Sequence, residues 1–306
     1  MNNLVRISFR LLMLVFLFSG MLAGCRSGDR KTSERDRSVE VIMDDAAIYE
    51  DIQKAERIFN ALPSPLESAM LVKSAGAQFN ESLLNPVENT RNYITNKSMA
   101  LNLGIYTCDL SVASLYDQTQ LIINYMNAAK KMADGLGILD AIEEETINRL
   151  EENINNREAI MDIVSETFMN SNAYLEENGQ PAVAAIVLVG GWMEGLYIST
   201  QLVDIKDLNG NKLVSRIIDQ KLSIDILLSL LESSKGNPAV DELIEQITRI
   251  KLIFDKINLT TSPVRPAYDQ SANVTVLRSE VKSDMTPEVF RELATVVDEI
   301  RSSFVK

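Results

Sequence analysis

Two carboxylates break the local pattern of the sequence more clearly than any other residues. Asp109 is the single charged residue of an apolar segment at 99–116, and Glu194 is the single charged residue of a second one at 181–203. A buried carboxylate is costly unless it is hydrogen-bonded, paired with a cation or bound to a ligand, so each of them requires a partner. Helical spacing places further polar side chains on the same faces: Asn102, Tyr106 and Tyr116 beside Asp109, and Tyr197 and Gln201 beside Glu194.

These residues leave two interpretations open. In the first, they form a polar pocket that binds a small polar ligand or a cation, or a hydrolase site in which the two carboxyls act as acid and base. In the second, each carboxylate is held inside the core by a Tyr hydroxyl, a helix N-terminus or a Lys or Arg side chain. The second interpretation predicts that Asp109→Asn and Glu194→Gln both destabilise the fold. The first predicts lost binding with little loss of stability.

The composition excludes several kinds of active site. The 306 residues include no histidine, which rules out Ser-His-Asp and Cys-His hydrolysis, HExxH zinc sites and His-ligated haem. One of the two cysteines, Cys108, lies in the apolar segment at 99–116, as is typical of an inert core thiol. We therefore assign no catalytic residue, and we expect no metal site and no cofactor.

Apolar residues at helical spacing predict an all-α fold, with the helices arranged as a multi-helix bundle or helical-hairpin array. Asn237 and Thr286 are each followed by proline and mark two helix starts. Strand signals are limited to one short extended segment near 273–281. The expected helices cover 43–60, 65–80, 86–117, 119–134, 138–154, 156–177, 181–203, 211–233, 238–257 and 287–304.

Two of these helices are apolar on almost every side, which indicates that they are the central, buried ones. They contain the segments 99–116 and 181–203, and therefore both unusual carboxylates. In the second of them, we expect Gly191 and Gly195 to let a neighbouring helix pack closely beside Trp192.

The N-terminal residues have the order of features found in a lipoprotein signal sequence. Arg6 and Arg10 precede an unbroken apolar run at 11–18, and the tetrapeptide LAGC follows and ends at Cys25. Only 15 uncharged residues separate Arg10 from Arg26, whereas a membrane-spanning helix needs roughly 20 apolar residues. LAGC resembles the lipobox of bacterial lipoproteins. That resemblance implies that Cys25 carries the lipid, with palmitate among its acyl chains, and becomes the first residue of the mature chain.

Charge and composition divide the chain into three parts. We expect a lipoprotein signal peptide at 1–24, a disordered tether at 25–40 and a single helical domain at 41–306. Five Lys or Arg, three Asp or Glu and no large apolar residue occupy 26–37, a composition that cannot form a core. The whole chain has a formal net charge of −13, which disfavours binding to nucleic acid.

The lipobox, the tether and the stretch at 85–116 together resemble uncharacterised, mainly helical lipoproteins of Bacteroides-type bacteria. This resemblance implies an envelope location and an all-α fold, and it implies no activity. We expect the protein to be lipid-anchored in the bacterial cell envelope, either facing the periplasm or on the outer-membrane surface. Its expected partners are the lipid bilayer and an unidentified envelope protein. The expected function is that of a non-catalytic binding or scaffold protein, with a small-ligand or cation carrier and a carboxylate-based hydrolase as alternatives.

Overall fold

The structure is a computed structural model that describes residues 65–139, 144–206, 208, 211–261, 263, 265–269, 274–278 and 281–306. These residues all belong to one compact unit, 56–306. The predicted signal peptide, the lipidation site at Cys25, the tether and the expected helix at 43–60 lie outside the described residues.

The described residues confirm the all-α prediction, because helices make up most of them. The α-helices are α3 (Pro65–Ser74), α4 (Asn96–Leu115), α5 (Thr119–Gly135), α6 (Glu144–Glu152), α7 (Arg157–Glu177), α8 (Pro181–Gln201), α9 (Lys212–Glu232), α10 (Pro238–Phe254) and α11 (Pro287–Phe304). Two short 3-10 helices, η1 (Glu81–Leu83) and η2 (Val87–Arg91), connect α3 to α4.

Side-chain caps explain where several helices begin. Asn237 and Thr286 accept hydrogen bonds from backbone N–H groups of the first turns of α10 and α11, and a proline follows each of them, as predicted. The prediction of one continuous helix over 86–117 was wrong. Thr95 and Ser98 form a reciprocal capping box that starts α4 at Asn96, so the preceding residues form η2 and a loop.

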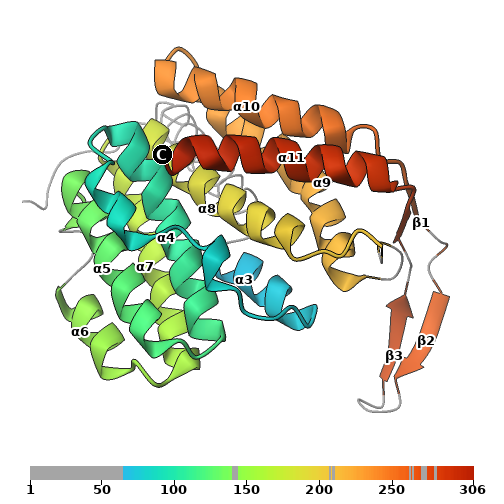
Figure 1. The fold of residues 1–306 in the computed structure, drawn as a ribbon, viewed down its shortest axis with the longest axis horizontal. Coiled ribbons are helices and arrows are strands. Elements are labelled where there is room, and N and C mark those ends of the chain that lie inside the picture. Colours follow the sequence, from blue (N-terminus) through green and yellow to red (C-terminus); the bar gives the residue numbers. More distant parts are fainter. Residues whose placement is uncertain are drawn as a thin grey trace, which may run out of the picture. The chain divides into compact units, whose positions relative to one another are not determined.

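Helix α8 lies between two groups of helices (Figure 1). On one side it packs against α4, α3 and α7, and on the other against α9 and α11. Helix α5 reaches the core by packing on α4, and α10 packs on both α9 and α11. By length and composition α8 resembles a membrane span, but most of it is buried inside this unit, as in the core helix of a globular protein. Its predicted central position is therefore confirmed.

The extended segment predicted near 273–281 corresponds to part of two antiparallel strand pairs between α10 and α11. Strand β1 (Leu259–Thr261) pairs with β4 (Val281–Ser283), and β2 (Arg265–Asp269) pairs with β3 (Val274–Arg278). In Figure 1 the β2–β3 pair extends away from the helices. These strand pairs do not contribute to the carboxylate site described below.

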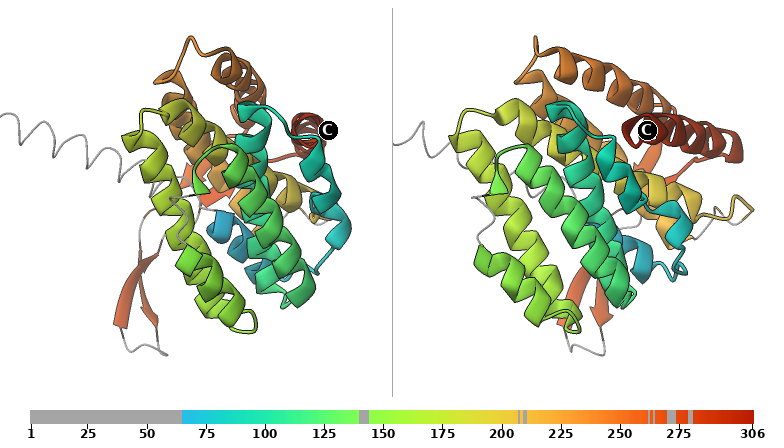
Figure 2. Two further views of the ribbon diagram at one scale, coloured as in Figure 1. Left: turned by 90° about the vertical axis from the view of Figure 1, so that its left-hand side faces the viewer. Right: turned by 60° about the vertical axis from the view of Figure 1, so that its left-hand side comes forward.

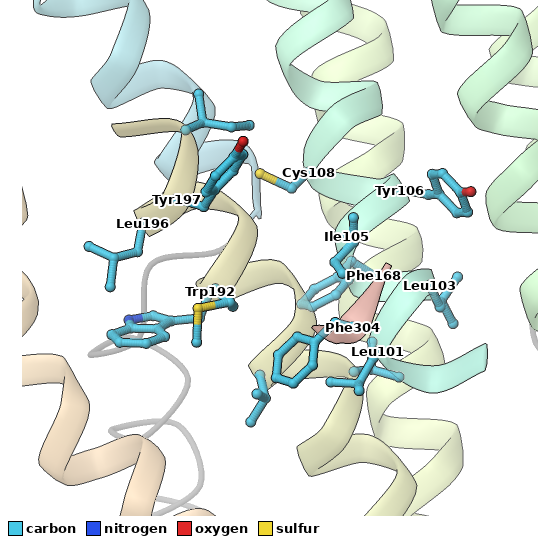
Figure 3. Packing of buried hydrophobic residues seen from close by; sticks show 14 of the residues in the cluster. Leu101, Leu103, Ile105, Tyr106, Cys108, Phe168, Trp192, Leu196, Tyr197 and Phe304 are labelled. Carbon is cyan, nitrogen blue, oxygen red and sulfur yellow. The ribbon is translucent and has the colours of Figure 1, made fainter. Parts of the chain in front are cut away.

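Helices α4 and α8 share the most extensive interface between elements, and they approach each other at glycines. A Cβ atom at Gly104 would collide with backbone atoms of Val187 and Gly191, and one at Gly190 would collide with the backbone of Leu101. Close packing in this part of α8 was predicted, but it centres on Gly190 and its counterpart Gly104. Figure 3 shows the apolar side chains that gather around this interface: Leu101, Leu103 and Ile105 from α4, Trp192, Leu196 and Tyr197 from α8, and Phe304 from α11.

Gly104→Ala and Gly190→Ala are each expected to destabilise the fold by at least about 2 kcal/mol, because the added methyl group meets a rigid backbone. Gly135→Ala is the matched control, since its Cβ would meet only the flexible Met99 side chain. That variant should stay within about 1 kcal/mol of the wild type. Urea unfolding followed by circular dichroism measures all three. Equal free energies of unfolding for the three variants would show that the close approach of α4 and α8 at these glycines does not contribute to stability.

Candidate functional site

Helices α4 and α8 bring the two unusual carboxylates together. Asp109 and Glu194 are both 0% exposed, and the charge of Glu194 acts directly on Asp109. The two apolar segments identified in the sequence thus bury their charges in one shared cluster. We call Asp109, Glu194 and Arg301 the charged cluster.

Arg301 of α11 is the partner of Glu194. Its Nε donates to Glu194 Oε2 over 2.8 Å and its Nη2 donates to Oε1 over 2.7 Å, which is a bidentate pair. The same Nη2 also donates to the carbonyl of Leu83 over 3.2 Å, and the guanidinium lies 4.5 Å from the centre of the Tyr197 ring. Arg301 is only 7% exposed. Although burial acts to lower its pKa, the Glu194 carboxylate beside it raises that pKa, so Arg301 remains charged.

Within the part of the chain that the structure describes, Asp109 differs from Glu194 in that no cation is paired with it. Its Oδ2 accepts a hydrogen bond from the backbone N–H of Asn85 over 3.0 Å, while its Oδ1 is buried without a partner among these residues. Burial, followed by repulsion from Glu194, raises the Asp109 pKa well above its ordinary value, and the attraction of Arg301 opposes this only in part. Burial beside Glu194 therefore favours the protonated, neutral form of Asp109 in the folded state. In that form the carboxyl can donate a hydrogen bond to Glu194.

A network of neutral polar side chains surrounds the charged cluster. The Asn85 amide donates to Tyr93 OH and to Asn102 Oδ1, both over 3.0 Å. Asn102 donates to the Phe304 carbonyl over 2.9 Å, and Tyr93 donates to the Val305 carbonyl over 3.2 Å. These bonds fix the last turn of α11 against α4 and the η1–η2 connection. They therefore hold Arg301 at the position where it meets Glu194.

The structure brings together only part of the predicted pocket. Asn102 and Tyr197 contact the charged cluster or its network. Tyr106 is buried nearby, but its hydroxyl donates to the Pro86 carbonyl. Tyr116 donates to the Ala77 carbonyl, and Gln201 is exposed at the end of α8. Neither Tyr116 nor Gln201 belongs to the site.

The arrangement is that of a sealed electrostatic core. Both carboxyls are completely buried, so a substrate cannot contact them. The negative charge of Glu194, which would attract a bound cation, is already neutralised by Arg301. Within the described residues, no three His, Cys, Asp or Glu side chains gather in a way that could hold a metal ion. Cys108 is a free buried thiol whose pKa is raised by burial. Like the two carboxyls, it is shielded from reagents.

Sequence reasoning missed three members of this site: Arg301, Asn85 and Tyr93. Arg301 had a detectable signal, because it lies four residues after Val297 and three before Phe304, both of which belong to the apolar stripe of α11. An arginine beside such a stripe is a candidate for burial. Asn85 and Tyr93 had no such signal, because both lie outside regular helix.

Comparison with known proteins finds no family model, no curated protein and no solved structure that matches the chain.

Arg301→Met is expected to lower the free energy of unfolding by about 3–5 kcal/mol, because Glu194 is left buried without its cation. Arg249→Met is the matched control. Arg249 forms a salt bridge with Glu299 over 2.9 Å, but both side chains are about half exposed, so its loss should change stability by less than about 1 kcal/mol. Chemical denaturation of both variants tests the difference. If Arg301→Met were as stable as the control, the charged cluster would not stabilise the fold.

Asp109→Asn is expected to be tolerated, in contrast to the sequence-based expectation that both carboxylate variants destabilise. Asparagine has the shape of a neutral aspartic acid and keeps a donor for Glu194 and an acceptor for the Asn85 N–H. Glu194→Gln should be strongly destabilising, because it leaves the Arg301 charge unpaired. Thermal melts at pH 7 measure both. Equal destabilisation by the two variants would contradict the assignment of a neutral Asp109.

The raised pKa of Asp109 also predicts how stability depends on pH. The folded state keeps a proton that the unfolded state releases above about pH 3.9, so this contribution to stability is complete below that pH. It is lost as the pH rises towards the folded-state pKa. Between pH 5 and pH 8, the wild type should therefore lose stability relative to Asp109→Asn, which has no titrating group at this position. A constant difference across that range would be incompatible with a raised pKa.

Proposed function

We propose that this chain is a lipid-anchored protein of the bacterial cell envelope that acts by binding and not by catalysis. The observation that carries the non-catalytic part is the complete burial of Asp109 and Glu194 against Arg301. These were the residues in the sequence with the strongest claim to acid–base chemistry. In this arrangement they face each other and Arg301 inside the core, and no reacting group can reach them.

The carboxylate-based hydrolase is the less favoured alternative. A pair of catalytic carboxyls needs an open cleft in which a sugar or water can lie between them. Asp109 and Glu194 instead interact directly, and each is 0% exposed. A cation carrier at the same position is disfavoured for a second reason, because Arg301 occupies the place of the cation.

The anchor is supported by the sequence. The basic residues, the apolar run and the LAGC tetrapeptide follow one another in the order that a lipoprotein signal requires. The short charged stretch at 26–37 then provides a spacer between the bilayer and the helical body. Such a protein would meet small molecules or other proteins close to the membrane surface, either in the periplasm or outside the outer membrane.

Cys25→Ser is expected to abolish labelling of the protein by radioactive palmitate and to release the protein from the membrane fraction. Cys108→Ala is the matched control, since it removes the other cysteine of the chain, which is buried in the core. That variant should remain labelled and membrane-bound. Labelling that persists in Cys25→Ser and disappears in Cys108→Ala would refute the proposed anchor.

A further inference from the structure

A narrow cavity lies among α4, α5, α6, α7 and α8, away from the charged cluster. Its volume is about 70 Å³, roughly half that of an engineered apolar cavity that accepts benzene. Helices α5 and α7 both belong to the group around α4 (Figure 2), and the cavity lies between them. On α7 its lining runs from Val164 to Leu175, a distance of roughly 16 Å along a helix. A small volume whose lining extends so far along α7 suits an unbranched alkyl chain better than a ring system or a sugar, and we call this cavity the channel.

The wall of this channel is apolar except at a few positions. Leu103 and Leu110 of α4, Met126 of α5 and Phe168 of α7 are typical of its lining. Burial of a hydrocarbon chain against such side chains is favourable by about 0.8 kcal/mol per methylene group. The channel therefore has the surface of a binding site for an aliphatic ligand.

One polar side chain in the wall has unused hydrogen-bonding capacity. Asn172 of α7 is 1% exposed, and neither its Oδ1 nor its Nδ2 has a hydrogen-bond partner among the described residues. Leaving a buried amide without partners is unfavourable, and such groups are uncommon in folded proteins. Other polar groups at the channel are less available. The hydroxyls of Thr107 and Thr167, for example, donate to carbonyls of their own helices.

The chemistry of Asn172 defines the complementary group. Its carboxamide presents one acceptor and one donor side by side, so its best match is a group that presents one donor and one acceptor. A primary amide and a neutral carboxylic acid both do this, and each can form two parallel hydrogen bonds with Asn172. An ester offers no donor, and an ionised carboxylate offers no proton to Oδ1.

We infer that this channel binds a short unbranched alkyl chain that ends in a neutral carboxamide or carboxylic acid, with the head group paired to Asn172. The inference rests on the proposed binding function and gives it a site and a ligand class, but it does not depend on the lipid anchor. Lys130 is the one charged side chain of the described lining and is exposed at its edge. The deeper wall, as far as the structure describes it, therefore contains no charged side chain that would favour an ionised head group.

Titration calorimetry of the purified full chain with hexanamide and hexanoic acid tests this inference. Hexanamide should bind at one site with the same Kd at pH 5 and pH 8. Hexanoic acid should bind at least about 100-fold more weakly at pH 8 than at pH 5, because its neutral fraction falls about tenfold per pH unit above the carboxyl pKa. Methyl hexanoate, which models the acyl chain of an esterified lipid, should bind at least about tenfold more weakly than hexanamide.

Asn172→Leu separates head-group recognition from packing. It should raise the melting temperature of the ligand-free protein, since it replaces an unpartnered buried amide, and it should weaken hexanamide binding at least about tenfold. Asn127→Leu, at an exposed position of α5, is the matched control and should leave binding unchanged. Ala129→Leu provides a second variant, because it narrows the channel from the half-buried edge and should weaken both ligands equally.

Three results would overturn the inference. The first is the absence of saturable hexanamide binding by the wild type, and the second is undiminished binding by Asn172→Leu. The third is tighter binding of hexanoic acid at pH 8 together with its loss in Lys130→Met, which would place an ionised head group at the channel edge. None of these results changes the labelling of Cys25, so failure of this inference is distinguishable from failure of the proposed anchor.

Discussion

The bidentate pair between Glu194 and Arg301 is the interaction on which the arrangement of the helices depends. It connects α8, which both groups of helices contact, to α11. Replacing a buried ion pair with apolar residues is often neutral for stability, so the pair is best regarded as a device for specificity. A bidentate contact requires the guanidinium to lie in one orientation relative to the Glu194 carboxylate. The hydrogen bonds from Asn102 and Tyr93 to the end of α11 hold that helix where the orientation is met. Together these contacts favour the observed register of α11 against α8 and α4.

The raised pKa of Asp109 follows from this pairing. One arginine can neutralise one carboxylate, and the core places two carboxyls near it. Burial and the charge of Glu194 favour the protonated form of the second carboxyl, in which it can donate a hydrogen bond to the first. With Asp109 protonated, the charged cluster carries no net charge in spite of its three ionisable groups. That balance explains how two carboxyls can be accommodated in the most apolar helices of the protein.

The sequence was sufficient to predict the helical class, the central helices, most helix boundaries and the two unusual carboxylates, but not that these two carboxylates lie together in one cluster. Local signals such as the caps at Asn237 and Thr286 depend on adjacent residues, so they are visible without a structure. The partner of Glu194 was not predicted, because it lies 107 residues away and its position depends on packing between α8 and α11. For the same reason, Tyr116 and Gln201 were wrongly assigned to the site. They share a helix face with a carboxylate, but the neighbouring elements direct one towards Ala77 and leave the other in solvent.

The separation of 107 residues between Glu194 and Arg301 also has a consequence for the order of folding. At a synthesis rate of about 5–20 residues per second, Glu194 exists for roughly 5–20 seconds before Arg301 is made. During that interval α8 has no cation with which to bury its charge, so the native core cannot close around it. The native contact between α8 and α11 can therefore form only after the last helix has been made. If the chain is exported in an unfolded state, as the proposed anchor requires, such a delay would help to keep the polypeptide competent for translocation.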